Sequence, residues 1–402
     1  MTIKRQNTLS NRRRTRHKTI TQSGDLSSQH IKLLKYYWKS ICKNKSDQSI
    51  PDTQELTDSD LSHIRQNPMY SHIPDKIRHH FESSSQHGIT YTTTLKIGRT
   101  VSIYITSPQR TNLDKKKTQI YLNNIIAWLN FISDFASSQC SQKLNIYLLL
   151  NAAKKRIPET DEEPMDTINA NTAFTTSCAA VNYIFIFRRE EWFKVLMHET
   201  FHCFGLDFSS FSTEVDKSNK RILSIFQAVH PDTDVRLYET YCEMWAEIFY
   251  FMFCVFTRRT GECDRFRESR FLQIWREEKL FSIYQSNKIL HRSGFKYSDI
   301  FAVSSRKTQY TENTQALSYY VLKSMILWNL DKFLKWCIKY NDPHIQFDPS
   351  RVTEYCEFIE ELVKTNKQYR AISSQHLIPK SKRDFDITQT MRMTANDPGW
   401  TQ

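Results

Sequence analysis

Hydrophobic and polar residues along the first half of the chain follow patterns typical of a small β-sheet flanked by helices. Apolar residues at helical spacing predict a helix over residues 30–43. Two runs rich in β-branched and aromatic residues predict a β-hairpin over residues 88–106 that turns at Gly98–Arg99. Asp114 can cap a long helix that is apolar on most sides and therefore buried. Further strands are predicted at residues 144–150, 168–178 and 182–187, of which 168–178 has the small side chains of an edge strand.

The second half of the chain has helical periodicity almost throughout. The last predicted strand leads directly into an apolar helix that ends near Gly205. Strands first and helices second predict an α+β fold. Beyond Gly205 the clearest helical segments are residues 214–229, 237–258, 314–340 and 352–364. We divide the chain into a basic, disordered tail (1–28), N-terminal helices and a hairpin (29–110), a core (111–300), a helical region (301–380) and a loose C-terminal extension (381–402).

Composition narrows the classes of protein to which the chain can belong. Of 402 residues, 39% are hydrophobic, which is enough to bury a core. Only 7 are glycine, and neither GxGxxG nor GxxxxGK[ST] occurs, which argues against a glycine-rich phosphate-binding loop. The net charge of +13 is uneven, because the basic residues of Lys4–Lys18 have no acidic residue among them. This tail either attracts nucleic acid or an anionic surface, or serves only to keep the protein in solution.

The cysteines and the longest apolar run predict where the protein resides. Nine cysteines occur without a CxxC pair, and no apolar run near the N-terminus resembles a signal peptide. We therefore expect reduced thiols in an intracellular protein. The longest apolar run, Ile248–Phe256, is too short to cross a bilayer, so we expect no transmembrane segment.

The helix after the last strand carries the stretch KVLMHETFHCFGLDF, which contains two histidines four residues apart. On a helix this spacing places His198 and His202 on one face, so both imidazoles can bind one zinc ion. Glu199 lies beside them, where it can reach a zinc-bound water and act as general base. Polar residues are costly in an apolar helix unless something satisfies them. The alternative interpretation is a set of hydrogen-bonded core residues without a metal.

A zinc site requires a third protein ligand, and carboxylates in two places are candidates. Asp207 follows the helix closely, but it has little room to turn back. Glu239, Glu243 and Glu247 recur every four residues on one face of an apolar helix, where a divalent cation would relieve their mutual repulsion. We assign Glu243 as the ligand and place Glu239 and Glu247, one turn to either side, as supporting carboxylates. The alternative interpretation of the row is an acidic stripe that faces water.

Together these features resemble the gluzincin class of zincin metallopeptidases. The stretch EMWAEIF, residues 243–249, is similar to the E-x-x-A-E-x-F element of the lethal-factor-like branch, in which the first glutamate binds zinc and the second supports a ligand. The stretch from NTAFTT to HCFGLDFS also resembles zinc peptidases encoded by large nucleocytoplasmic DNA viruses. The resemblance covers residues 114–258. It implies a zincin-like fold, in which a small mixed sheet with an edge strand packs on the HExxH helix and a mostly helical C-terminal half follows.

The same resemblance implies a substrate, a location and a further catalytic group. The substrate is a polypeptide that pairs with the edge strand, and the location is the cytoplasm or nucleus of a host cell, or a virion. A tyrosine or histidine often stabilises the oxyanion in gluzincins, so Tyr238 ranks first for this role, ahead of Arg236 and His230. Two departures narrow the class: the N-E-x-x-S-D element of thermolysin-like enzymes does not occur, and Phe208 stands where metzincins have their third ligand.

Two cysteines adjoin the proposed ligands in sequence. Cys203 follows His202, but neighbouring helical positions point about 100° apart, so Cys203 cannot share the site of that histidine. Cys242 precedes Glu243. Free cysteines are commonly inert core residues, so we expect neither thiol to act as ligand or nucleophile.

These observations predict a zinc-dependent metallopeptidase. His198, His202 and Glu243 would bind Zn²⁺, and Glu199 would act as general base on the attacking water. The rival interpretation is a non-catalytic, virion-structural or nucleic-acid-tethered protein that retains the zincin fold. Glu199 favours the enzyme, because a purely structural zinc site needs no general base.

Overall fold

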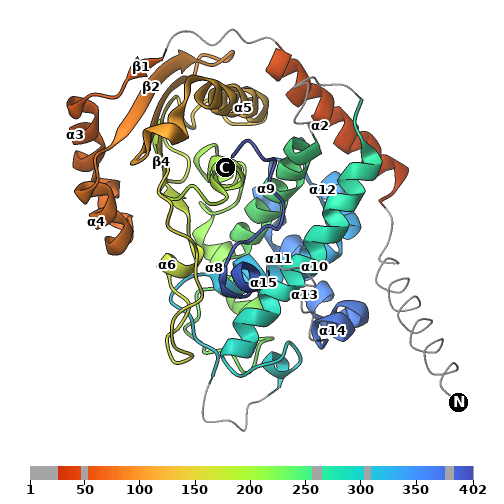
Figure 1. Cartoon of the computed structure of the whole chain (residues 1–402). Helices are drawn as coiled ribbons and strands as arrows, with labels where there is room; N and C mark the ends of the chain where they lie inside the picture. The colour runs from red at the N-terminus through yellow and green to blue at the C-terminus, as the bar shows by residue number, and fades with distance from the viewer. Residues whose placement is uncertain (1–25, 47–52, 256–264, 303–308, 376–383, 402) are drawn as a thin grey trace, which may run out of the picture.

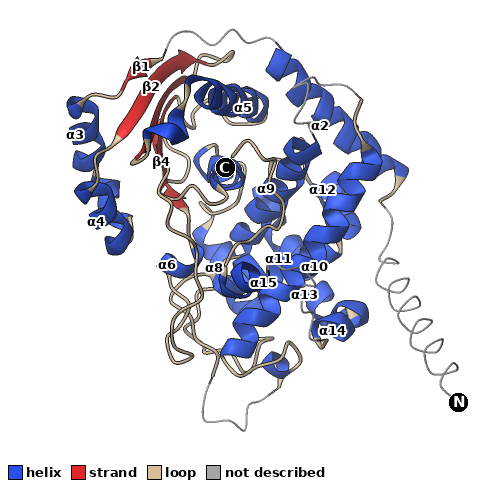
Figure 2. Cartoon of the chain, in the orientation of Figure 1, coloured by secondary structure: helices blue, strands red, loops and turns tan. Residues whose placement is uncertain are grey.

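The structure is a computed structural model of the chain, and it describes residues 26–46, 53–255, 265–302, 309–375 and 384–401 (Figure 1). Most of the tail predicted for residues 1–28, including all of Lys4–Lys18, lies outside the described residues. A mixed sheet lies at one side of the molecule, and helices make up most of the remainder (Figure 2). The predicted α+β class is therefore confirmed.

The sheet consists of six strands, which are Gln54–Glu55 (β1), His87–Thr94 (β2), Thr100–Ser107 (β3), Lys143–Leu149 (β4), Ala173–Thr175 (β5) and Val181–Ile186 (β6). Their order across the sheet is β1-β2-β3-β4-β6-β5. β2 and β3 form the predicted hairpin, which turns at Gly98 (φ 84°). β3, β4 and β6 are parallel neighbours, and β5 runs antiparallel to β6 at the edge. The β5 edge of the sheet packs against α7 (Trp192–Cys203), the helix that carries His198 and His202.

The two faces of the sheet belong to different hydrophobic clusters, because successive residues of a strand point to opposite faces. Ile146 of β4 packs into the main cluster with the inner helices, while Tyr147 packs into a smaller cluster with the outer helices. The sheet is thus a middle layer (Figure 1). The inner helices are α5 (Lys115–Ser133) and α7 (Trp192–Cys203), and the outer helices are α3 (Asp58–Gln66) and α4 (Asp75–Ser83).

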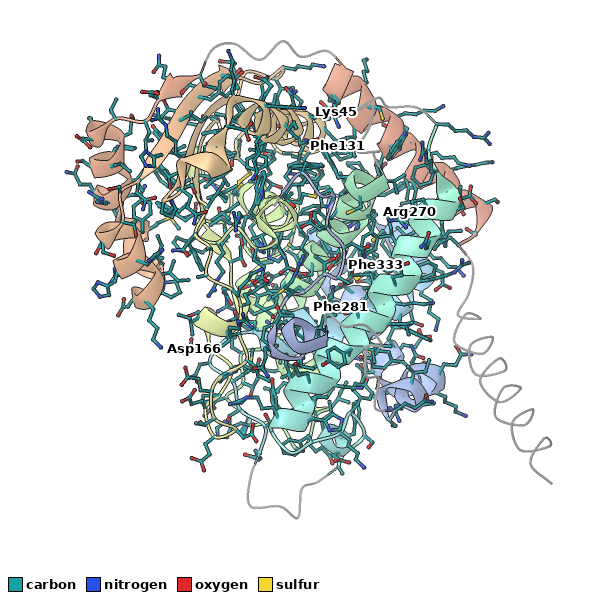
Figure 3. The ribbon with its side chains drawn as sticks, viewed as in Figure 1. Lys45, Phe131, Asp166, Arg270, Phe281 and Phe333 are labelled. Carbon is teal, nitrogen blue, oxygen red and sulfur yellow. A yellow bond between two sulfur atoms is a disulfide. The ribbon has the colours of Figure 1, made fainter. Side chains whose placement is uncertain are left out.

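Further helices make up much of the rest of the protein. They are α2 (Ser28–Ser46), α6 (Thr167–Ala170), α8 (Ser212–Leu223), α9 (Leu237–Val255), α10 (Glu268–Arg292), the π-helical turn η4 (Leu317–Leu322), α11 (Lys323–Trp328), α12 (Leu330–Tyr340), α13 (Val352–Thr365), α14 (Lys367–Ser373) and α15 (Asp384–Gln389). α9 packs along α7, and α10 and η4 pack on α9. Side chains fill the space between the sheet and these helices (Figure 3). Among the described residues, no helix has the length and apolar character needed to cross a membrane.

A single hydrophobic cluster links regions that the sequence divides. The cluster extends from Leu26 to Met393, and the sheet contains strands from both sides of residue 110. The predicted boundaries near residues 110 and 300 therefore do not separate independent cores. The helical C-terminal half packs directly on the motif helix through α9, so it contributes to the surroundings of the site.

Three predicted elements differ clearly from the observed ones in length. The helix predicted over residues 214–229 ends at Leu223. The edge strand predicted at residues 168–178 is reduced to β5, because Asp166 and Asn169 form a capping box that starts the short helix α6. The helix predicted over residues 314–340 is divided into η4, α11 and α12, and α12 begins after a non-helical residue at Asn329.

Cys140 and Cys178 form a disulfide, so the prediction that the cysteines are reduced thiols is wrong for this pair. Cys140 precedes β4, and Cys178 precedes β6. Because β4 and β6 are parallel neighbours, their first residues lie together and bring the two cysteines into contact. The other cysteines within the described residues are free thiols, as predicted.

The last described residues are packed into the protein and do not form the predicted loose extension. Thr394 is fully buried, and Met393 is 6% exposed. Trp400 packs against Trp192 at the start of α7, with ring centroids 6.1 Å apart. The C-terminal end of the chain therefore belongs to the core and lies close to the motif helix (Figure 1).

Candidate metal centre

α7, the helix that carries the HExxH motif, is buried along its whole length. It begins after Glu191, whose left-handed backbone (φ 60°) turns the chain from β6 into the helix. Trp128 of α5 donates a hydrogen bond from Nε1 to Thr200 Oγ1 at 3.0 Å, which helps to fix the rotation of α7 about its axis. Gly205 (φ 66°) follows the helix; a side chain there would strain the left-handed backbone, and its Cβ would lie 3.0 Å from Cys140 Sγ.

His198, His202 and Glu239 form a tight cluster between α7 and α9. The Nε2 atoms of the two histidines lie 3.0 Å apart. Glu239 Oε2 lies 3.0 Å from His198 Nε2 and 3.4 Å from His202 Nε2. All three side chains are buried. The helical spacing of the motif thus directs both imidazoles to one point.

Each imidazole has a carboxylate close to its other ring nitrogen, which forms a hydrogen bond in the case of His202. His198 Nδ1 lies 3.0 Å from Glu243 Oε1, and His202 Nδ1 lies 2.7 Å from Asp207 Oδ2. A carboxylate at Nδ1 is the usual arrangement at a metal-binding histidine, because it leaves Nε2 for the metal. Asp207 does turn back toward the helix, contrary to expectation, since the left-handed backbone at Gly205 reverses the chain.

The glutamate row of α9 is buried, so it is not an acidic stripe that faces water. Glu243, predicted as the third ligand, forms an ion pair with Lys194 and supports a histidine. Glu247, predicted to support a histidine, instead lies 2.6 Å from Lys323 Nζ. Glu239 is the member of the row whose carboxylate faces both Nε2 atoms. The geometry therefore favours Glu239 over Glu243 as the third ligand.

The donor atoms fit a zinc ion in type and in spacing. Zinc–imidazole bonds are about 2.0–2.1 Å long, so the ligand atoms around a tetrahedral ion lie about 3.3 Å apart. The distances among His198 Nε2, His202 Nε2 and Glu239 Oε2 are 3.0, 3.0 and 3.4 Å. Two imidazoles and one carboxylate are also a common ligand set of catalytic zinc, which keeps a fourth position for water or substrate. The cluster can therefore hold the zinc ion that the motif predicts.

A small cavity of about 30 Å³ borders the cluster at His198, and Glu243 lines it from α9, whereas His202 and Glu239 do not. Glu199 lines it from α7, and Ala173 lines it from the edge strand β5. Tyr319 of η4 lines another side, with its ring centroid 6.3 Å from that of His198, and Met393 lines the cavity from the C-terminal end of the chain. The cavity has room for roughly two water molecules. Glu199 is therefore placed where a general base for a water beside the cluster would lie.

Tyr319 is a residue of the site that the sequence did not indicate. It lies in a π-helical turn, a rare conformation that is frequent at functional sites. The backbone N–H of Leu317 at the start of this turn donates to the partly buried carboxylate of Glu312 at 2.8 Å. In the sequence Tyr319 belongs to the run LSYYVL, where nothing distinguishes it from an ordinary core residue.

Burial and the surrounding carboxylates act in opposite directions on the two histidines. Burial alone lowers the pKa of His198, but its contacts with Glu239 and Glu243 raise this pKa to about 9. Burial likewise lowers the pKa of His202, and nearby acidic groups raise it well above its ordinary value. Burial also raises the pKa of Glu199. The carboxylates therefore favour a positive charge at the pair of imidazoles.

The three residues predicted as oxyanion donors lie outside the cavity. Tyr238 packs against His202 with ring centroids 5.9 Å apart, but it does not line the cavity. Arg236 and His230 lie closest to acidic residues at the protein surface. None of the three therefore has the position of Tyr319.

The two cysteines next to the motif residues have different surroundings. The Cys203 thiol lies 3.9 Å from the backbone oxygen of Thr200. Cys242 Sγ lies 3.7 Å from His202 Nδ1 and 3.8 Å from Asp207 Oδ2. Cys242 is thus on the side of the imidazole away from His198 and Glu239, at the nitrogen that Asp207 already contacts.

Comparison of the chain with family models, with curated proteins and with solved structures finds no match. Only the arrangement of the cluster itself therefore bears on the function. Its distinguishing features are two converging imidazoles, a carboxylate within 3.4 Å of both, and a separate glutamate at the adjoining cavity.

Proposed function

We propose that the protein is a zinc-dependent metallopeptidase of zincin-like fold, in which His198, His202 and Glu239 bind zinc and Glu199 is the general base. The observation that carries this proposal is the convergence of both Nε2 atoms and Glu239 Oε2 to within 3.0–3.4 Å of one another. The carboxylates close to both Nδ1 atoms support it, because they leave Nε2 to face the shared point. Glu199 supports a hydrolytic role, since zinc that only stabilises a fold needs no general base.

Different groups around the cavity would carry out different steps of peptide hydrolysis. Zinc, when bound, lowers the pKa of a water molecule and polarises the scissile carbonyl group. Glu199 accepts the proton of the attacking water and passes it to the nitrogen of the leaving amine. An extended peptide can pair with β5 as an additional strand, because β6 occupies only one side of β5 and Ala173 borders the cavity.

Tyr319 is our candidate for the donor that stabilises the oxyanion, in place of Tyr238. Tyr319→Phe removes only the hydroxyl group, and we expect kcat/KM for an unfolded-protein substrate to fall by about 10²–10³ with zinc content unchanged. Tyr238→Phe is the matched control and should change kcat/KM little. A larger loss in Tyr238→Phe than in Tyr319→Phe would return the role to Tyr238.

The purified protein is expected to contain about one zinc ion per chain. His202→Ala removes one of three protein ligands and should abolish stoichiometric zinc binding, measured by mass spectrometry of the metal. His230→Ala is the control, because His230 lies near the surface and close to an acidic residue there. Zinc that stays bound at full stoichiometry in His202→Ala would contradict the site.

The second candidate is a non-catalytic protein, such as a virion-structural component, in which zinc only stabilises the fold. The size of the cavity favours it, because about 30 Å³ admits water but no peptide. Both candidates predict bound zinc. Only the peptidase predicts cleavage that depends on Glu199, so the substitution of that residue separates the two.

A further inference from the structure

The C-terminal segment, defined as residues 390–396, passes between α10 and the N-terminal end of α7 and closes one side of the metal-site cavity. Its buried members are Thr390, Met391, Met393 and Thr394. Polar groups contact it from several elements that are far apart in the sequence. Most of these groups form hydrogen bonds with its backbone.

Two buried glutamates accept hydrogen bonds from consecutive N–H groups of the C-terminal segment. Glu191 accepts from Met393 N at 3.2 Å and from Thr394 N at 2.7 Å. Glu278 of α10 accepts from Ala395 N at 3.0 Å. Burial alone raises the pKa of Glu191, but neighbouring lysine and arginine side chains lower it to about 2. Glu191 therefore accepts both bonds as a carboxylate.

Carbonyl groups of the same segment accept hydrogen bonds from other walls. The donors are Lys288 Nζ to Thr390 O at 2.6 Å, Tyr320 Oη to Met391 O at 2.5 Å, Gln285 Nε2 to Arg392 O at 2.6 Å, and Lys323 Nζ to Met393 O at 2.9 Å. Bonds to the main chain do not depend on which side chains the bound segment carries. Buried polar and charged groups are unfavourable without such partners. These walls are therefore built around a peptide backbone.

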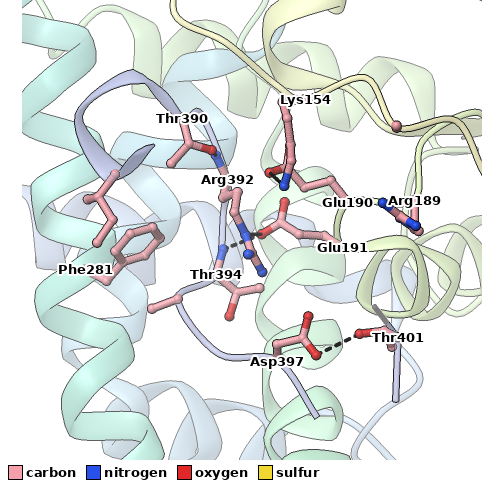
Figure 4. A pocket seen from close by; sticks show the side chains of 13 residues that line it. Lys154, Arg189, Glu190, Glu191, Phe281, Thr390, Arg392, Thr394, Asp397 and Thr401 are labelled. Atoms are coloured by element: carbon pink, nitrogen blue, oxygen red, sulfur yellow. Dashed lines mark hydrogen bonds and ion pairs between the residues drawn. The ribbon is translucent and has the colours of Figure 1, made fainter. Parts of the chain in front are cut away.

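Neighbouring side chains of the C-terminal segment face two different cavities. Met393 lines the small cavity at the zinc cluster, together with Glu199. Arg392 and Thr394 line a second cavity of about 510 Å³, where Arg392 Nε lies 3.8 Å from Glu191 Oε1 (Figure 4). The C-terminal segment is thus a wall between the two cavities. Its withdrawal would connect them and leave room for a peptide.

We propose that Glu191, Glu278, Gln285, Tyr320 and Lys323 line a groove that binds a peptide backbone, and that the chain's own C-terminal segment occupies this groove and shuts the metal-site cavity from substrate. The first part stands on the hydrogen bonds above. The second part rests on the proposed function, because only a peptidase requires substrate to enter.

Ala395→Pro tests the groove in the full-length protein. Proline removes the N–H that donates to Glu278, and the exposed side chain of Ala395 leaves space for the ring. Ala395→Gly retains the N–H and is the matched control. Loss of one hydrogen bond to a charged group should raise the open fraction of the groove by about tenfold or more. Faster amide hydrogen exchange at Met393 and Thr394 should report this increase.

A fluorescent peptide with the sequence of residues 384–402 measures binding to the groove by anisotropy. Because the peptide binds only an open groove, its apparent Kd should fall in Ala395→Pro by the same factor by which amide exchange rises. Wild type and Ala395→Gly should bind it equally weakly. Unchanged amide exchange in Ala395→Pro, or equal peptide binding by all three proteins, would overturn the proposal.

Hydrolysis of an unfolded protein by the zinc-loaded proteins tests the second part separately. Ala395→Pro should cleave faster than Ala395→Gly by the same factor, and the added peptide should inhibit it. Enhanced peptide binding with an unchanged, measurable rate of cleavage would refute the closing role alone. Enhanced peptide binding without cleavage by any variant would refute the proposed peptidase and leave the groove standing.

Discussion

Glu199→Gln is expected to lower kcat for the hydrolysis of an unfolded protein by about 10²–10⁴-fold, the usual contribution of a general base. Glutamine is close in shape to glutamate but cannot accept the proton of the attacking water. Zinc content should stay at the wild-type level, because Glu199 lies beside the cavity and is not one of the three clustered donors. The rate of cleavage and the zinc content are measured on the same preparation.

The matched control for this substitution is Glu214→Gln. Glu214 is an exposed glutamate on α8, so the loss of its charge should affect neither zinc nor cleavage. If Glu199→Gln cleaves at the rate of Glu214→Gln, Glu199 is not the base. If no protein cleaves although each binds zinc, the non-catalytic alternative is the better account.

The second large effect is expected to distinguish Glu239 from Glu243. Glu239→Gln removes the carboxylate that faces both Nε2 atoms, so stoichiometric zinc binding should be lost. Glu243→Gln should lower zinc affinity by only about 10–100-fold, as for a carboxylate that supports a ligand. It should also lower the free energy of unfolding by about 3–5 kcal/mol, because the buried ammonium group of Lys194 loses its closest partner.

Zinc titration and denaturant unfolding of both variants measure these effects. The double variant Lys194→Met/Glu243→Gln should recover most of the lost stability, since replacing a whole buried ion pair is far less harmful than breaking it. The reverse result, with zinc lost in Glu243→Gln and retained in Glu239→Gln, would restore Glu243 as the ligand that the sequence predicts.

The parts of the site that could be predicted are those that local sequence determines. The four-residue spacing of His198 and His202 places both side chains on one face of α7, whatever the rest of the protein does. The strands beside this helix were recognisable because β4 and β6 are buried on both faces and therefore read as continuous apolar runs. Asp114 likewise caps α5 by accepting from Lys117 N, as its position before the apolar run predicted.

The parts that could not be predicted depend on how distant elements pack. Glu239, Glu243 and Glu247 share one face of α9. The sequence alone does not show which of them lies opposite the histidines of α7. The buried Lys194 and Lys323, which neutralise two of these glutamates, carried no signal beyond an ordinary lysine. Tyr319, the disulfide and the C-terminal segment are likewise consequences of tertiary packing.

The contacts between α7 and α9 also determine how far one helix can advance along the other. α7 presents Lys194, His198 and His202 at intervals of one turn. α9 runs in the opposite direction and presents its carboxylates at the same interval, so each basic side chain lies against a carboxylate. A shift of α9 by one turn along α7 would leave a charged side chain unpaired in the interior, at a cost of several kcal/mol. The pairing of charges therefore favours one register of the two helices, and that register fixes where the imidazoles and Glu239 meet.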